Sequence, residues 1–211
     1  MQKADIKRIL LFGKGCSTLK LENRYREYSY YSESNLINNK KEKIMDQVSN
    51  KDKNLMDQIE SVKAEELELI FSEFSHETAI NLGYALHEKA KILGVSVTID
   101  IRKGDHILFH LAMEGTSPNN DRWVKRKSNT VQFLHMSSYR AGLENILSGE
   151  TLASQQYLNP MEYAEHGGSF PLTIKGTGVI GAVTVSGLPQ KKDHELVVGV
   201  LRSFIADNSN S

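Results

Sequence analysis

Three histidines stand where elements of the chain are expected to end or begin, and such positions could hold a ligand. His135 follows one predicted helix, His166 precedes a glycine pair, and His194 lies beside Asp193 in the first turn of the last predicted helix. Side chains at one end of a sheet can converge into a pocket. We therefore expect His166 and His194 to lie at the same end, with Asp193 hydrogen-bonded to one imidazole. The alternative is that these groups only satisfy helix termini.

The second half of the chain has one dense basic cluster, made of Arg122, Lys125, Arg126 and Lys127. Arginine offers a planar fork of donors that fits a carboxylate, a phosphate or a haem propionate. The cluster could thus clamp an anion, with Arg126 reaching the histidine region, or it could be a solvated helix face. Trp123 next to it is expected in the core or at a subunit contact.

Other chemistries are disfavoured by missing partners. His106 and His110 are spaced by four on a predicted strand and would share a face, but no third ligand follows at a recognisable spacing, so no metal site is predicted. Cys16 is the only cysteine, which excludes an internal disulfide. His166-Gly167-Gly168 matches the HGG of esterase oxyanion holes, yet the chain has no GxSxG motif. Gly167 would then only end a helix, and no catalytic residue is assigned.

Charge divides the chain near residue 50. The chain has 26 basic and 26 acidic residues, a balance that gives no case for nucleic acid. Residues 1–53 hold 12 basic and 7 acidic residues, whereas the remainder holds 14 and 19. Residues 1–50 are expected to be an extension that is disordered or not part of the native protein, and residues 55–208 a single domain. No apolar run is long enough for a membrane span, so a cytoplasmic protein is expected.

Apolar periodicity predicts ten elements. Helices are expected over residues 55–71, 76–93, 121–134, 139–147 and 159–167, with a last helix that has Asp193 in its first turn. Strands are expected over residues 95–101, 107–113, 170–174 and 179–185, in two hairpins. Two hairpins exclude a simple parallel βαβ fold. The fold class is therefore α+β, with an antiparallel sheet flanked by helices.

Several short motifs in a fixed order resemble an uncharacterised family of bacteria and fungi in the GlcG/PduO-like superfamily, whose domain is often labelled haem-degrading. They are Asp121-Arg122-Trp123, Arg126-Lys127, Phe133, Ser137-Ser138-Tyr139, Tyr163, His166-Gly167-Gly168-Ser169-Phe170-Pro171, Thr184-Val185-Ser186-Gly187-Leu188 and Asp193-His194. The resemblance covers roughly residues 67–208. It implies a profilin-like α/β sandwich that assembles into dimers or higher oligomers. It also implies that haem, which some relatives bind, is a possible cofactor.

Residues and resemblance together predict a cytoplasmic, oligomeric domain that binds a small ligand, such as an anion, or a protein partner. The predicted ligand-binding residues are Arg126, Lys127, His135, Ser138, Tyr139, His166, Gly167, Asp193 and His194. One alternative is a haem-binding or haem-handling enzyme that uses a histidine near Arg126. The other is a non-enzymatic scaffold for protein interactions. A concave pocket with perturbed pKa values would favour the enzyme, and a large exposed apolar patch would favour the scaffold.

Overall fold

The computed structural model describes residues 50–208. The chain divides into two compact units, Met1–Asp52 and Lys53–Ser211, and the second unit is the subject here. The predicted extension over residues 1–50 lies outside the described residues, apart from its last position. Within the described residues, no helix has both the length and the hydropathy that crossing a membrane requires.

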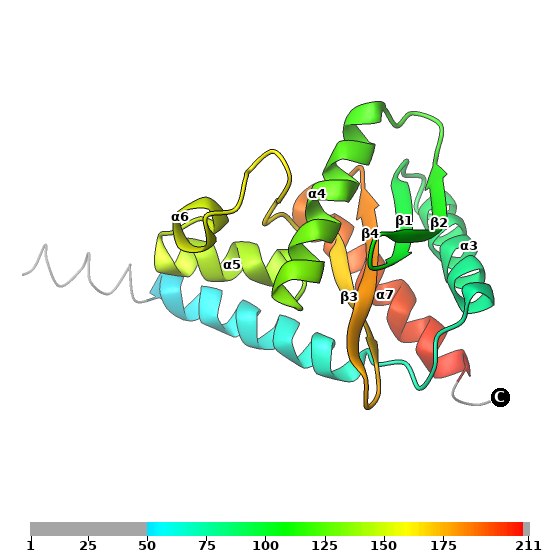
Figure 1. Ribbon diagram of the computed structural model, residues 1–211, viewed down its shortest axis with the longest axis horizontal. Helices are drawn as coiled ribbons and strands as arrows, with labels where there is room; N and C mark the ends of the chain where they lie inside the picture. The colour runs from blue at the N-terminus through cyan, green and yellow to red at the C-terminus, as the bar shows by residue number, and fades with distance from the viewer. Residues whose placement is uncertain (1–49, 209–211) are drawn as a thin grey trace, which may run out of the picture. The chain divides into compact units, whose positions relative to one another are not determined.

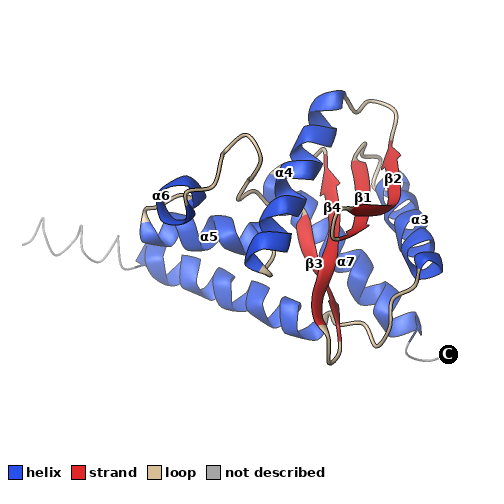
Figure 2. Cartoon of the chain, in the orientation of Figure 1, coloured by secondary structure: helices blue, strands red, loops and turns tan. Residues whose placement is uncertain are grey.

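A four-stranded antiparallel sheet forms the centre of the domain, in the order β2-β1-β4-β3 (Figures 1 and 2). Its strands are β1 (Thr98–Lys103), β2 (His106–Ala112), β3 (Ser169–Ile174) and β4 (Gly178–Ser186). Strands β1 and β2 form one hairpin, β3 and β4 the other, and β1 pairs with β4 to join them. The predicted α+β class and both hairpins are therefore confirmed.

Helices cover both faces of this sheet. Helices α3 (His76–Ile92) and α7 (Gln190–Asn208) pack on one face, and α4 (Pro118–Leu134) packs on the other (Figure 1). Ser75 caps α3 through a reciprocal pair of hydrogen bonds with Thr78. Helix α5 (Ser138–Ser148) contacts α4, α7 and β3, and the short α6 (Leu152–Gln156) follows it.

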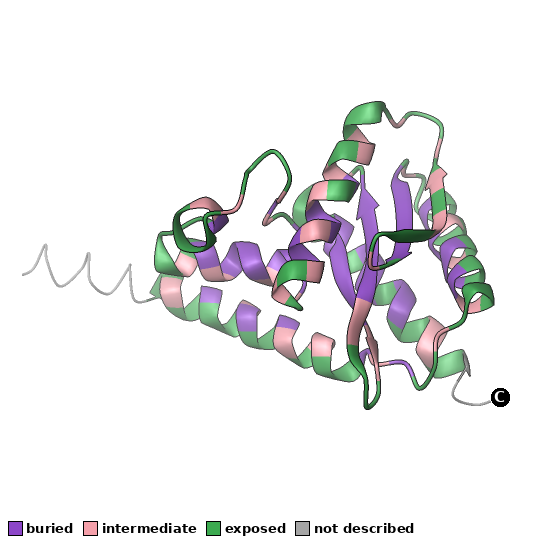
Figure 3. Ribbon diagram, viewed as in Figure 1, coloured by how far each residue is buried: buried purple, intermediate pink, exposed green. Residues whose placement is uncertain are grey.

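The two faces of the sheet differ in polarity because side chains alternate along each strand. Toward α3 and α7 the strands present Ile99, Ile101, Phe170, Leu172, Val183 and Val185, all in one apolar core. The inner strands of the sheet are buried along much of their length (Figure 3). On the opposite face the buried side chains include Thr98, Asp100, Arg102, Thr184 and Ser186. The apolar face supplies most of the hydrophobic stabilisation, at about 1.5–3 kcal/mol for each large side chain that is fully buried.

Residues 53–68 form a helix that packs against α5. Leu55, Ile59 and Val62 make a second apolar cluster with Tyr139 and Leu143. The carboxylate of Glu66 in this helix accepts the backbone N–H of Ser137 (2.7 Å) and pairs with the Arg140 guanidinium (2.8 Å). The start of α5 is thereby held by a polar contact as well as by apolar packing.

The predicted helix over residues 159–167 is wrong. The Asn159 side chain accepts the Met161 N–H (3.0 Å), and its carbonyl accepts the N–H groups of Glu162 and Tyr163, which makes a turn. Asparagine favours such local bonds over a helix. The helix in this region is α6, capped by Thr151. Gly167 therefore does not end a helix.

The prediction that His106 and His110 share a face is also wrong. The β1–β2 register shifts between Ile101 and Arg102, because β2 carries an extra residue there. A bulge of one residue turns the following side chains to the other face. His106 stacks edge-on against His76 just at the start of α3, while His110 reaches Asp100 on the α4 side.

Candidate functional site

Helix α4 carries two of the predicted ligand-binding residues, Arg126 and Lys127, and Trp123 beside them. Pro118 occupies its first turn, and the Asn120 side chain accepts the N–H of Ser117 at the N-cap (2.9 Å). The helix therefore begins three residues before the predicted start. Lys127 faces the sheet and is buried, whereas Trp123 and Arg126 are partly exposed.

The glycine pair after His166 lets the chain pass close to α7 and β4. Gly168 has φ of +120°, which favours glycine, and a Cβ there would lie 2.7 Å from the Lys127 amine. The Ser138 hydroxyl donates to the His166 carbonyl (2.6 Å) and accepts the Ser169 N–H (3.1 Å). The predicted residue Ser138 thus positions this segment.

Lys127 and Asp193 form a buried ion pair that joins α4 to α7. The lysine amine donates to the Asp193 carboxylate (2.8 Å) and to the Val185 carbonyl (3.2 Å). The two side chains are 4% and 1% exposed. Burial is the main cause that lowers the pKa of Lys127 and raises that of Asp193, and each partner partly opposes the shift of the other. Asp193 also accepts the Leu188 N–H (3.0 Å), which fixes the loop before α7.

Two pockets in this region share His166, and the first of them is lined by the ion pair. The first has a volume of about 240 Å³, and Trp123, Lys127, His166 and Asp193 are among its lining residues. The second has a volume of about 210 Å³ and is lined in part by Arg126 and His166. Four of the predicted ligand-binding residues therefore converge on adjoining pockets.

Arg126 has no partner of opposite charge in the described chain; the same holds for Arg122, but Arg122 is exposed, whereas Arg126 is partly buried and lines a pocket. Its guanidinium carbon lies 4.4 Å from the centre of the Trp123 ring, a cation–π contact. Within residues 50–208 it has no ion-pair partner, and its buried Nε has no hydrogen-bond acceptor. An arginine in that state presents its remaining donors to the pocket it lines.

His166 packs edge-on against Trp123, with the ring centres 5.0 Å apart. Burial is the largest cause that lowers its pKa from the ordinary 6.5; Lys127 and Arg126 lower it further, and Glu165 opposes them. The imidazole is thus held toward its neutral form mainly by burial.

The other predicted residues lie elsewhere. His135 is the exposed C-cap of α4 in a left-handed conformation. The His194 Nε2 lies 2.9 Å from the Glu65 carboxylate, and the centre of its ring lies 4.7 Å from the centre of the Tyr139 ring. Gly167 donates its N–H to the Gln190 side chain (3.3 Å), which ties the loop before β3 to the start of α7.

The predicted hydrogen bond between Asp193 and an imidazole does not form within residues 50–208. The Asp193 carboxylate accepts hydrogen bonds from the Lys127 amine and the Leu188 N–H instead, and the His194 Nε2 is hydrogen-bonded to Glu65. His166 lines both pockets described above and His194 lines neither, so the two imidazoles do not share one of them.

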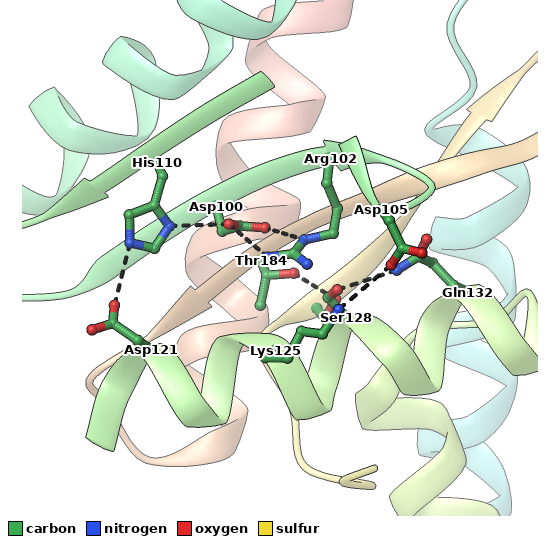
Figure 4. Close-up of polar contacts among 10 residues, drawn as sticks. Asp100, Arg102, Asp105, His110, Asp121, Lys125, Ser128, Gln132 and Thr184 are labelled. Atoms are coloured by element: carbon green, nitrogen blue, oxygen red, sulfur yellow. Dashed lines mark hydrogen bonds and ion pairs between the residues drawn. The ribbon is translucent and has the colours of Figure 1, made fainter. Parts of the chain in front are cut away.

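A polar network under α4 was not predicted as a site (Figure 4). The Arg102 guanidinium binds the buried Asp100 carboxylate through two nitrogens, at 2.6 and 2.8 Å. The ring nitrogens of His110 lie 3.0 Å from Asp100 and 3.2 Å from Asp121. The signal was present in β1, where polar residues alternate with isoleucines. Across residues 50–208, no group of three or more histidine, cysteine or acidic residues is arranged to hold a metal ion.

Comparisons with known proteins agree on one family. Residues 74–202 match the family model described as "Haem degrading protein HbpS-like". A UPF0303 protein of Paraburkholderia phymatum is 52% identical over 128 residues, which cover 61% of this chain and 78% of the relative. The crystal structure of Ybr137w protein aligns with a TM-score of 0.67 at 27% identity, over 72% of this chain and 89% of that one. The PduOC:heme complex aligns with a TM-score of 0.55, over 62% and 94%; at 18% identity it supports the fold alone.

Proposed function

Because the chain belongs to the HbpS-like family and to the UPF0303 proteins, as the motifs predicted, we propose that it is a ligand-binding domain whose anion site is built around Arg126. The family model carries a haem-degrading description, and the fold is that of the HbpS and PduO structures. The site itself supports a more specific ligand class, a small carboxylate or phosphate.

The unpaired state of Arg126 carries this proposal. A guanidinium that is held on an aromatic ring, without a carboxylate partner in the described chain, is ready to bind an anion bidentately. Stacking on Trp123 fixes the direction of the side chain, so little rotamer entropy is lost on binding. His166 at the shared wall can add a second donor.

Pocket size favours a small anion over haem. The volumes of about 210 and 240 Å³ fall below the roughly 300–1,000 Å³ of pockets that enclose drug-sized ligands. An enclosed haem does not fit these residues. His194 does not offer an axial ligand either, because its Nε2 lies at the Glu65 carboxylate and its unpaired Nδ1 is fully buried.

The experiment is an anion titration of wild type, Arg126→Gln and Arg122→Gln. Arg122 is an exposed arginine on the same helix, so its variant controls for net charge. Succinate and inorganic phosphate are added while the fluorescence of Trp123, the single tryptophan, is followed. Arg126→Gln should weaken binding by about tenfold or more, because a charged hydrogen bond contributes about 1.5–3 kcal/mol. Equal binding by both variants, or none by wild type, would contradict the proposal.

Haem is the second arm of the same experiment. Absorbance titration of wild type and His166→Ala should show no saturable haem site that depends on His166. Stoichiometric uptake by wild type that is lost in His166→Ala would favour the haem-handling alternative instead.

The proposal includes a cytoplasmic homo-oligomer. Ile80 and Tyr84 of α3 are 38% and 56% exposed, and Tyr84 packs on Phe109 of the edge strand β2. An edge strand beside apolar side chains can pair with a second copy. Light scattering should give more than the monomer mass at micromolar concentration, and Tyr84→Lys should lower it while Ile146→Lys on α5 does not. A monomeric wild type would exclude this assembly.

A further inference from the structure

The Arg126 pocket, which is the cavity of about 210 Å³ that Arg126 and His166 line, has an apolar side. The apolar residues come from α6 and from the loop that leads to β3, and they are Leu152, Ala153, Leu158, Pro160 and Ala164. The adjoining pocket, which Arg126 does not line, is lined mainly by polar side chains, such as Asn119, Asn120 and Gln190. The Arg126 pocket is therefore suited to a ligand that is charged at one end and apolar at the other.

Arg126 supplies the positive charge of this pocket. Its Nε is buried without a hydrogen-bond acceptor in the described chain, so a ligand reaches the guanidinium through the two terminal nitrogens. A carboxylate matches that pair of donors. Glu165 also lines the pocket, and its carboxylate would repel a second negative charge on the ligand. A ligand with one negative charge is therefore favoured over a ligand with two.

The volume of the pocket sets the length of the apolar part. One water molecule occupies about 30 Å³ of the liquid, so a cavity of about 210 Å³ takes about seven atoms other than hydrogen. A carboxylate group accounts for about three of them, which leaves about four carbon atoms. Each of those carbons adds to the affinity when it leaves water and packs against apolar side chains.

We propose that the Arg126 pocket selects a monocarboxylate with a short apolar chain of about four carbons. The carboxylate binds the terminal nitrogens of Arg126, and the chain packs against Leu158 and its apolar neighbours. This inference rests on the proposed anion site and narrows its ligand class. Phosphate has no apolar chain, and succinate would place a second carboxylate in a pocket that already contains Glu165.

Calorimetric titration of the full chain compares isovalerate, acetate and succinate. Each apolar carbon that leaves water tightens binding about fourfold, so isovalerate, with three carbons more than acetate, should bind about tenfold more tightly or better. Succinate should bind more weakly than isovalerate. The heat-capacity change on binding should be negative for isovalerate and smaller for acetate, because only the longer chain buries apolar surface. Isovalerate that binds no more tightly than acetate would overturn the proposal.

Two variants locate the apolar chain. Leu158→Ala removes a partly exposed side chain from the pocket, whereas Ile146→Ala removes an exposed one from α5, outside the pocket. Leu158→Ala should weaken isovalerate binding by about fourfold or more and leave acetate binding unchanged, and Ile146→Ala should change neither. Equal isovalerate binding by the two variants would also overturn the proposal. In that case, succinate and phosphate that still bind through Arg126 would leave the anion site intact, whereas anion binding that is independent of Arg126 would remove both proposals.

Discussion

Replacing one partner of the Lys127–Asp193 pair tests how the site is held together. Lys127→Met removes the amine and keeps most of the apolar stem. Asp193→Asn removes the charge and keeps an oxygen that can accept the Leu188 N–H. Each single variant leaves one buried charge without its partner, because both side chains are almost fully buried. The double variant contains neither charge.

The expected sizes follow from that burial. Removing one partner of a buried ion pair lowers the free energy of unfolding by about 3–5 kcal/mol. In a domain of this size each kcal/mol lowers the melting temperature by about 2–4 °C. Each single variant should therefore melt roughly 6–20 °C below wild type. Burial is the first cause of both pKa shifts and moves both groups toward their neutral forms, so the pair does not fully offset its desolvation. The double variant should therefore be more stable than either single variant.

The measurement is guanidinium denaturation of the four proteins, followed by circular dichroism and by Trp123 fluorescence. A double-mutant cycle should give a coupling of about 2 kcal/mol or more between the two positions. Additive losses, or single variants within about 1 kcal/mol of wild type, would refute the view that this pair is buried and coupled.

Three further outcomes are expected. Burial lowers the pKa of His166 from 6.5, so just below pH 6.5 the unfolded chain binds more protons than the folded one. The free energy of unfolding should therefore fall as the pH drops through this window. Denaturation at several pH values should show a smaller fall for His166→Gln. Gly168→Ala should lower the free energy of unfolding by about 2–4 kcal/mol, because φ is positive there and the added Cβ would collide with the Val185 carbonyl. Gly176 also has a positive φ but open space around it, so Gly176→Ala should lower it by only about 1 kcal/mol. Thermal melting compares the two variants. Glu66→Gln should lower stability by about 1–3 kcal/mol in the same assay, because Glu66 holds the start of α5.

The sequence predicts the framework of this domain because its framework is periodic. Strand β1 alternates isoleucine with polar residues, and the helix signal after Ser75 is a capping box that the structure contains. The turn at Lys103–Gly104 has the positive φ that a hairpin glycine supplies. These features depend on neighbours in the chain, so they can be inferred from local spacing alone.

The site was predicted only in part because its contacts depend on residues far apart in the chain. The basic cluster indicated Arg126 and Lys127. That Lys127 pairs with a carboxylate and Arg126 does not depends on packing between distant residues, because Asp193 lies 66 residues after Lys127. His194 was assigned to the pocket from its place at the start of α7. Glu65, on a helix 129 residues earlier, takes its Nε2 instead.

The difference between the two faces of the sheet explains where binding can occur. The face under α3 and α7 is closed by close-packed apolar side chains, where an unpaired polar group would be too costly. The face under α4 already contains buried charges that are held by partners, such as Asp100 with Arg102 and Lys127 with Asp193. Arg126, by contrast, has no ion-pair partner within residues 50–208 and lines a pocket on the α4 side of the sheet. The stability of the domain therefore comes mainly from one face of the sheet, and the anion site that we propose lies on the other.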